Sequence, residues 1–296
     1  MKAPSKIINP ANSMLSIIRI AATLAILIFL SGAVPSHAAE LKQATVEAWD
    51  GYVRTVNSAM SRRAAGETPF LWVDESRDLL RRVQAGEVLV AAHDLVKVPH
   101  GLIHHWMGAM FLRDATLGDV TRVLNDYNRY AEFYRPFVVK SKLLEDTTDR
   151  QKITILMVQK AFSVTAAVEA DNEIRVTKLD DSRLYSFSNS VRVQEIANYG
   201  RRDEQLLPEG QGPGYIWRTV GITRLVERDG GVYVEMETIA LSRGIPIEFR
   251  WLIKPVTEKL PRQIMFDTLN NTKAAVRREA EPISQRNLNI AKLMIP

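Results

Sequence analysis

The sequence of 296 residues contains no cysteine. This absence excludes a disulfide framework, a cysteine nucleophile, a zinc ribbon and an iron–sulfur cluster. A chain of this length can bury a core large enough to fold without such cross-links. Its content of 46% hydrophobic and 25% charged residues is ordinary for a globular protein. The lack of cysteine also suits an oxidising compartment, where free thiols react.

The chain also lacks a concentration of charge of one sign. The formal net charge is +5, but Lys2, Lys6 and Arg19 are the only charged residues before residue 39, so the remainder has 36 basic and 34 acidic residues. Arginine pairs are scattered along the chain, at residues 62–63, 81–82, 201–202 and 277–278. Affinity for nucleic acid needs several clustered Lys or Arg side chains. We therefore expect no nucleic-acid partner.

The chain has no long hydrophobic run. The apolar stretch from Ile20 to Leu30 follows three basic residues and ends at Ser31-Gly32, with Ser36-His37-Ala38 shortly after it. This is the pattern of a secretory signal peptide with a small-residue cleavage site, and it is shorter than the roughly 20 apolar residues of a spanning helix. We expect residues 1–38 to be a signal peptide, and the protein to be exported to the periplasm or cell envelope of a bacterium. An uncleaved anchor is the alternative.

Several catalytic motifs are missing. The sequence has no Gly-x-Ser-x-Gly elbow, no glycine-rich phosphate loop and no His-Glu-x-x-His motif. Hydrolase and nucleotide chemistry therefore have no positive support, and we expect neither a cofactor nor a metal site.

The part of the chain at residues 39–98 is predicted to be an N-terminal helical extension. Residues 41–63 carry apolar side chains at helical spacing, including Trp49, Val56 and Met60. A shorter helix is predicted at 75–85, with Asp74 as its cap.

From Gly101 onward the pattern changes to strands. The residues at 101–113 predict a strand covered on both faces, and Thr116 to Asp119 resemble a capping box that opens a helix ending at Pro136. Asp229-Gly230 predicts a hairpin turn. Further strands are predicted at residues 137–145, 152–169, 173–179, 184–196, 215–227, 231–242 and 245–253.

A long helix is predicted at the end of this region, over residues 256–278, with Pro261 in its first turn. One strand, a helix, an antiparallel meander and a terminal helix form an α+β layout, in which a curved antiparallel sheet grips the C-terminal helix. The predicted domain covers residues 99–279, and residues 280–296 form a C-terminal tail.

The region from Gly101 to Val276 resembles the START-like superfamily of helix-grip lipid-transfer domains and polyketide cyclases. The opening strand, the Leu124–Tyr130 run in the first helix, and the helix after Trp251–Pro255 carry this resemblance. Three phrases are similar to an uncharacterised group of exported bacterial members, at residues 101–106, 228–235 and 260–262.

The resemblance implies an internal apolar cavity. Members of the superfamily bind chemically diverse apolar molecules, so the resemblance does not name the ligand. The leading hypothesis is an exported binding or transfer module for a lipid, isoprenoid or quinone, with transient membrane contact. The alternatives are a cyclase or dehydratase that uses cavity residues, and an envelope protein that binds a partner and has a closed cavity.

Two groups of residues are weak catalytic candidates. His104 and His105 are neighbours on a strand, so their side chains point to opposite faces and cannot both bind one metal ion without a bulge. A histidine among apolar neighbours is more often a satisfied core residue than a base. Glu235 and Glu237 share one face of a strand, and Arg218 on the preceding strand is a candidate ion-pair partner. A solvated outer face is the favoured interpretation of these glutamates, and an acid–base pair is the alternative.

The candidate ligand-binding residues combine apolar bodies with polar tips. Tyr127 belongs to the apolar stripe of its helix; packing is the favoured interpretation, and orientation of a ligand by its hydroxyl group is the alternative. The full set is His104, Trp106, Tyr127, Tyr130, Trp217 and Arg218.

Overall fold

The computed structural model describes residues 40–280, except for residues 162–163 and 245–249. The chain divides into two compact units, residues 1–39 and 40–296, and all described residues belong to the second unit. The predicted signal peptide at 1–38 and the tail beyond Ala280 lie outside the described residues. No helix in the described part is both long enough and apolar enough to cross a membrane.

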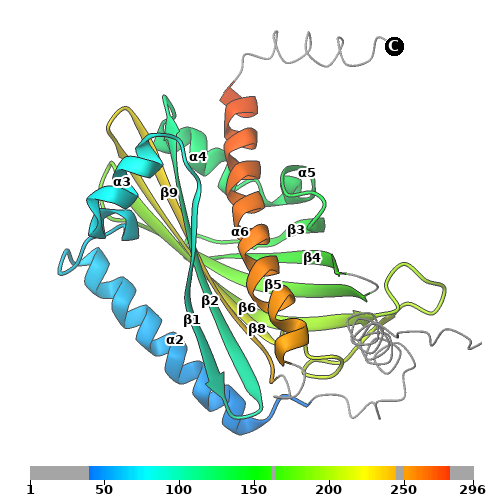
Figure 1. The fold of residues 1–296 in the computed structure, drawn as a ribbon. Coiled ribbons are helices and arrows are strands. Elements are labelled where there is room, and N and C mark those ends of the chain that lie inside the picture. The colour runs from blue at the N-terminus through cyan, green and yellow to red at the C-terminus, as the bar shows by residue number, and fades with distance from the viewer. Residues whose placement is uncertain (1–39, 162–163, 245–249, 281–296) are drawn as a thin grey trace, which may run out of the picture. The chain divides into compact units, whose positions relative to one another are not determined.

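The second unit is built on one antiparallel sheet of nine strands in the order β1-β2-β9-β8-β6-β5-β4-β3, with the short β7 paired to β6 (Figure 1). The strands are β1 (Leu89–Val98), β2 (Gly101–Arg113), β3 (Val138–Asp146), β4 (Gln151–Ala161), β5 (Val164–Lys178), β6 (Arg183–Ala197), β7 (Gln205–Leu206), β8 (Arg218–Arg228) and β9 (Gly231–Arg243).

The β8–β9 hairpin has the predicted tight turn. Asp229 and Gly230 both have positive φ, at 57° and 74°, which matches the two-residue turn that suits twisted strands. The turn places Arg228 opposite Gly231. It therefore fixes the register of two central strands.

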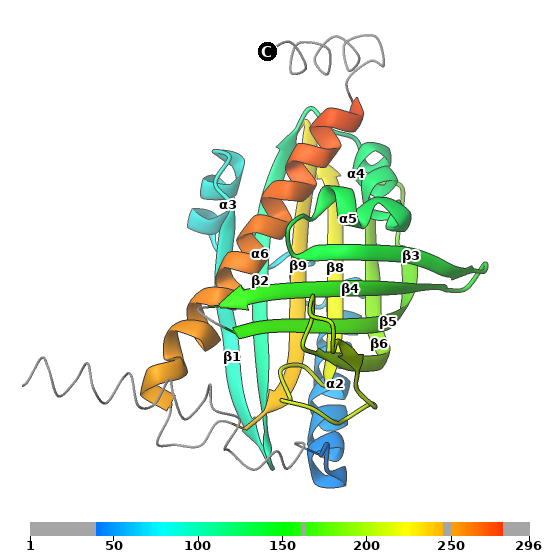
Figure 2. The same cartoon turned by 90° about the vertical axis from the view of Figure 1, so that its right-hand side faces the viewer.

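The long helix α6 (Arg250–Ala280) lies against the sheet on the face that we call the concave face (Figure 2). The approach is closest at Gly108 of β2, where an added Cβ atom would lie 2.7 Å from Cδ1 of Leu269. Met265 and Leu269 join residues of β2, β8, β9 and α4 in the main hydrophobic core. The predicted α+β fold class, a curved antiparallel sheet that grips a long C-terminal helix, is confirmed.

The opposite, convex face of the β1–β2–β9–β8 part is covered by the N-terminal layer. This layer consists of α2 (Gln43–Ala64), the 3₁₀ helix η1 (Trp72–Glu75) and α3 (Arg77–Gln84). Trp49, Val56 and Met60 are buried, as the apolar stripe predicted. Asp74 is not a cap, because the shorter helix begins after Ser76. Asp74 instead forms an ion pair with Arg228 of β8.

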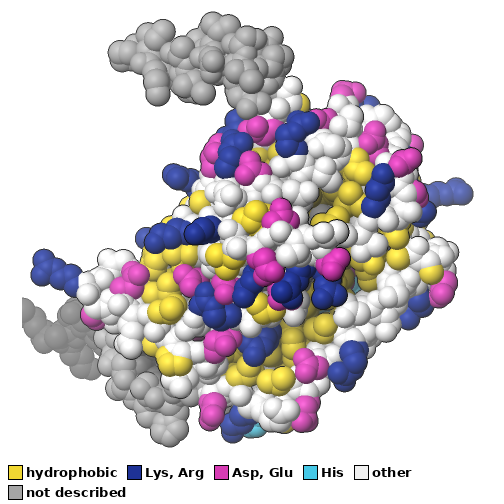
Figure 3. Space-filling view, turned by 180° about the vertical axis from the view of Figure 1, so that it is seen from behind, with side chains coloured by type: hydrophobic (Ala, Val, Ile, Leu, Met, Phe, Trp, Pro, Cys, Tyr) yellow, Lys and Arg dark blue, Asp and Glu magenta, His cyan; other side chains and the backbone are white. Residues whose placement is uncertain are grey.

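The rest of the convex face, over β4, β5 and β6, is not covered by these helices. Basic and acidic side chains interleave on the face seen in Figure 3. Cross-strand ion pairs join β5 and β6: Arg192 lies 2.9 Å from carboxylate oxygens of both Glu169 and Asp171. Opposite charges on facing strands stabilise a solvated sheet surface modestly.

The single helix expected between Thr116 and Pro136 is broken. Its capping box forms as predicted, with the Thr116 hydroxyl accepting from the Asp119 amide and the Asp119 carboxylate accepting from the Thr116 amide. The chain then leaves helical geometry at Asp126, which has ψ of 63°. The result is three short pieces: α4 (Leu117–Leu124), η2 (Tyr127–Arg129) and α5 (Tyr130–Phe133).

Three other predictions about elements need correction. Residues 89–98, predicted as part of the N-terminal helical extension, form the strand β1, whose period-two alternation is interrupted by a bulge between Ala92 and Asp94. The run predicted as one strand at 152–169 is the β4–β5 hairpin. Residues 250–253, predicted as strand, begin α6, so Pro261 lies inside the helix and not in its first turn. The remainder of that predicted strand, residues 245–249, lies outside the described residues.

Candidate functional site

The middle of the concave face is a row of side chains that crosses five strands. Trp106 of β2, Thr238 of β9, Gly221 of β8, Ser188 of β6 and Ile174 of β5 are successive cross-strand partners. We call these five residues the floor row. Cross-strand partners project from the same face of a sheet, and the two neighbouring residues of β2 that meet α6, Gly108 and Met110, share the face of Trp106.

The residues at the centre of the floor row have small side chains and are partly or fully exposed. Thr238 is exposed although strands flank it on both sides, and Trp106, Gly221 and Ser188 are half-buried. The next row of partners is equally mixed in size: Met236, Thr223, Ser186 and Val176, of which Val176 is 45% exposed. Because the central side chains are short, they leave room above the sheet that larger residues would fill.

His104 lies on the same face as Trp106, two residues away along β2. Its Nε2 atom is 2.9 Å from the Ser242 hydroxyl, which also donates to the Arg243 carbonyl. This arrangement assigns the imidazole proton to Nε2 and leaves the Nδ1 lone pair as an acceptor. Nδ1 is buried and has no hydrogen-bond partner among the described residues. Burial lowers the pKa of His104, so the neutral ring is the form present at neutral pH.

The two predicted tyrosines lie in the core beside the concave face, with their hydroxyl groups bonded inside the protein. Tyr127 donates to Gln151 over 2.9 Å, and burial, followed by the charge of Asp146, raises the pKa of Tyr127 to about 12. Tyr130 donates to the Leu124 carbonyl and packs edge-on against Tyr127. Both tyrosines therefore pack in the core, and their hydroxyl groups donate their protons to partners within the protein.

Two other predicted ligand-binding residues, Arg218 and Trp217, are not part of the floor row. Arg218 pairs in register with Leu241, which puts it on the face opposite His104, and it lies 3.6 Å from Glu209. Trp217 precedes β8 and is 4% exposed, and its Nε1 atom has no hydrogen-bond partner in the described part of the chain.

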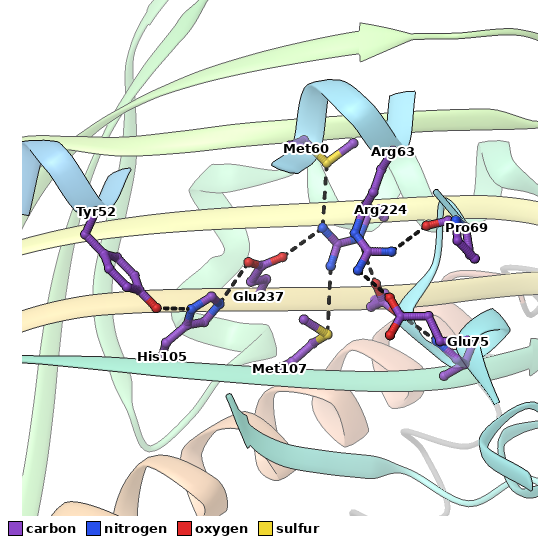
Figure 4. Close-up of polar contacts among 11 residues, drawn as sticks. Tyr52, Met60, Arg63, Pro69, Glu75, His105, Met107, Arg224 and Glu237 are labelled. Carbon is purple, nitrogen blue, oxygen red and sulfur yellow. Dashed lines mark hydrogen bonds and ion pairs between the residues drawn. The ribbon is translucent and has the colours of Figure 1, made fainter. Parts of the chain in front are cut away.

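Glu235 and Glu237 lie on the convex face, beneath α2 and η1, so the interpretation as a solvated surface is wrong. Arg224 lies between them: its Nε atom is 2.7 Å from Glu235. Its Nη1 atom is 2.8 Å from Glu237 (Figure 4). The proposed partner Arg218 is thus replaced by Arg224. Arg224 and Glu235 are each 1% exposed, and Glu237 is 7% exposed.

The chain of contacts continues from Glu237 to α2. His105 Nε2 is 2.8 Å from Glu237, and His105 Nδ1 is 2.8 Å from the Tyr52 hydroxyl. Figure 4 shows Tyr52, His105, Glu237 and Arg224 in one line between helix and sheet. His105 is therefore a satisfied core histidine, as the commoner interpretation predicted. The contacts of Tyr52 with His105 and of Arg224 with the two glutamates were not predicted from the sequence.

The electrostatics of the two glutamates differ. Burial alone would raise the pKa of Glu237, but the hydrogen bond from His105 and the charge of Arg224 outweigh burial and lower the pKa to about 2. For Glu235, burial is the larger influence and raises the pKa despite the ion pair with Arg224. Glu235 and Glu237 thus share one arginine, and their different surroundings shift their pKa values in opposite directions.

This buried network and His104 do not form one site. Glu235 and Glu237 pair in register with Ala109 and Met107, whereas His104 pairs with Ala240, so the glutamates and His104 project from opposite faces of the sheet. The cyclase or dehydratase hypothesis places these groups in the same cavity, and the register does not support it. Among the described residues, no three His, Asp or Glu side chains converge as a metal site.

Comparisons with known proteins give similarity at the level of structure. No family model matches the chain, and no curated protein matches it. A STAR-related lipid transfer protein from Xanthomonas axonopodis is 20% identical, with a TM-score of 0.44 over 64% of this chain and 98% of that one. The Zhui aromatase/cyclase from Streptomyces sp. R1128 is 12% identical, with a TM-score of 0.44 over 61% and 98%. Human STARD10 is 8% identical, with a TM-score of 0.40 over 69% and 80%.

Proposed function

We propose that the concave face binds an apolar small molecule of the lipid, isoprenoid or quinone class, between the floor row and α6. The observation that carries the proposal is the exposure of Thr238, which has strands on both sides and projects from the face of the sheet on which α6 lies. A protein core is normally filled to crystal-like density. A central row with short side chains, bounded by Trp106 and Ile174, is a surface that a ligand can complete.

The surroundings suit a ligand that is mostly apolar with one polar group. Trp106, Met236 and Val176 supply apolar surface beside the short polar side chains of the floor. Burial of an alkyl chain contributes about 0.8 kcal/mol per CH₂ group. The exposed Thr238 side chain offers a hydroxyl group to the polar end of the ligand, since ligand sites commonly combine an apolar lining with a few oriented polar groups.

Native mass spectrometry of the purified chain tests this function. A stoichiometric bound lipid-like mass, released on denaturation and identified by its fragments, is the expected result. Repeated preparations with no bound mass, together with failure to take up added fatty acids, isoprenoid alcohols or quinones, would overturn the proposal.

The proposal includes an exported protein that contacts a membrane transiently to exchange its ligand. Support comes from the sequence of residues 1–38, with its basic start, apolar run and small-residue site before Ala39. The mass and N-terminal sequence of the protein recovered from the envelope of its host test this part. A chain that begins near Ala39 is expected, and a full-length chain in the cytoplasm would contradict it.

A further inference from the structure

A second candidate site is a depression at the sheet edge, away from the floor row. The β1–β2 pairing begins at Leu89 and Ala109, but β2 continues to Arg113, so its last residues have no β1 strand beside them. An open depression of about 310 Å³ lies there. Its walls are Gln84 at the end of α3, the turn at residues 85–86, Phe111, Arg113, Asp114, and Lys273 and Arg277 of α6.

The depression is electropositive. It brings together three cations and one carboxylate, a formal charge of +2. Among the described residues, no carboxylate lies within 4 Å of the charged nitrogens of Arg113, Lys273 or Arg277. The neighbouring arginines of the same region behave otherwise: Arg278 pairs with Glu132 at 2.8 Å, and Arg129 with Glu279 at 3.0 Å.

Contacts within the protein position one of the three cations of the depression, Arg113. The Arg113 guanidinium donates to the Gln84 carbonyl over 3.4 Å and lies 5.9 Å from the centre of the Phe111 ring. These contacts hold Arg113 at the wall of the depression. The three cations outnumber the one carboxylate, so like charges repel each other across the depression, and a bound anion would relieve this repulsion.

We propose that this depression binds a phosphate group, carried by a small phosphate ester or by the headgroup of a lipid. A guanidinium group offers a planar pair of donors that matches phosphate oxygens, and an ammonium group adds a point charge. Arg113, Arg277 and Lys273 supply two such forks and one such charge from two structural layers. Asp114, on the rim, can accept a hydrogen bond from a hydroxyl group of the same ester.

Isothermal titration calorimetry of the full chain with sn-glycerol 3-phosphate tests the proposal. Saturable binding is expected, with at least a tenfold loss of affinity in Arg277→Gln and in Lys273→Gln. The matched control is Arg122→Gln, an exposed arginine of α4 that pairs with Asp119, and it should leave the affinity unchanged. Equal losses in the control and the site variants would overturn the proposal.

Vesicle sedimentation separates the two sources of the phosphate group. A lipid headgroup as ligand predicts binding to phosphatidylglycerol vesicles that exceeds binding to phosphatidylcholine vesicles and that falls in Arg277→Gln. A small ester predicts binding of glycerol phosphate without vesicle binding. No saturable binding of either probe would refute the site. The Thr238→Trp variant, which blocks the floor row, should retain phosphate binding, so this test is independent of the proposed apolar ligand.

Discussion

The Nε atom of Arg224 donates a hydrogen bond to Oε1 of Glu235 over 2.7 Å, and both side chains are 1% exposed. The pair lies where the N-terminal layer meets the convex face of the sheet. Val73 of η1 adds its backbone amide to the same carboxylate at 3.4 Å. The network therefore joins residues of η1 to the centre of the sheet.

Replacement of Arg224 by Met tests how much this network contributes to the stability of the fold. The substitution keeps much of the apolar stem but leaves two buried carboxylates without their cation, so we expect a loss of about 3 to 5 kcal/mol in the free energy of unfolding. Urea denaturation measures it. The control Arg122→Met, in an exposed pair, should change stability by less than about 1 kcal/mol. A loss in Arg224→Met as small as in the control would show that the network contributes little.

Glu237 predicts a dependence of stability on pH. Its pKa of about 2 in the folded protein lies below the ordinary value of 4.5, so the unfolded chain binds the proton more readily. Its contribution is fully present above pH 4.5 and is lost as the pH falls from 4.5 through 2. In Glu237→Gln this part of the acid sensitivity should disappear. Unfolding free energies of both proteins at pH 7 and pH 3 measure the effect, and an unchanged difference between the two pH values would contradict it.

Tyr52 tests the contact between α2 and the sheet. Tyr52→Phe removes the hydroxyl group that lies 2.8 Å from His105 Nδ1 and should lower stability by about 1 kcal/mol. Hydrogen exchange should show faster opening of α2 than of the central strands. Uniform loss of protection over the whole sheet would mean that α2 does not open separately.

Gly108 tests the closeness of α6 to the sheet. In Gly108→Ala the new methyl group would lie 2.7 Å from Leu269 Cδ1 and 2.8 Å from Met265 Cγ, and we expect a loss of about 1 to 3 kcal/mol. Gly221→Ala is the matched control on the same face, because its nearest neighbour is 3.8 Å away. Similar thermal stability of both variants would argue against a tight contact between α6 and β2.

Much of the fold follows from local patterns. The β2 strand was predicted from a nearly continuous run of apolar residues, and the long C-terminal helix from apolar residues at helical spacing. The β1 strand was not predicted, because a bulge next to His93 breaks the alternation on which a strand prediction depends. The break at Asp126 is likewise local geometry that the apolar stripe from Val120 to Tyr134 does not reveal.

The pairing of Arg224 with Glu235 could have been predicted. A two-residue turn at Asp229-Gly230 sets the register of the hairpin, and counting back from it places Arg224, not Arg218, opposite Glu235. The burial of these residues could not be predicted, because it depends on which face of the sheet α2 covers. The amphipathic pattern of α2 does not specify the surface against which it packs. The openness around Thr238 depends in the same way on tertiary packing.

The most direct test of the proposed apolar site is the binding of a fluorescent fatty acid to Thr238→Trp and Asn189→Trp. Both parent side chains are exposed, but Asn189 pairs with Val220 and projects from the opposite face of the sheet. A tryptophan at position 238 would occupy the space above the floor row, so we predict at least a tenfold loss of affinity in that variant and unchanged affinity in Asn189→Trp. Unchanged binding in Thr238→Trp, with both variants folded by circular dichroism, would contradict a ligand site between the sheet and α6.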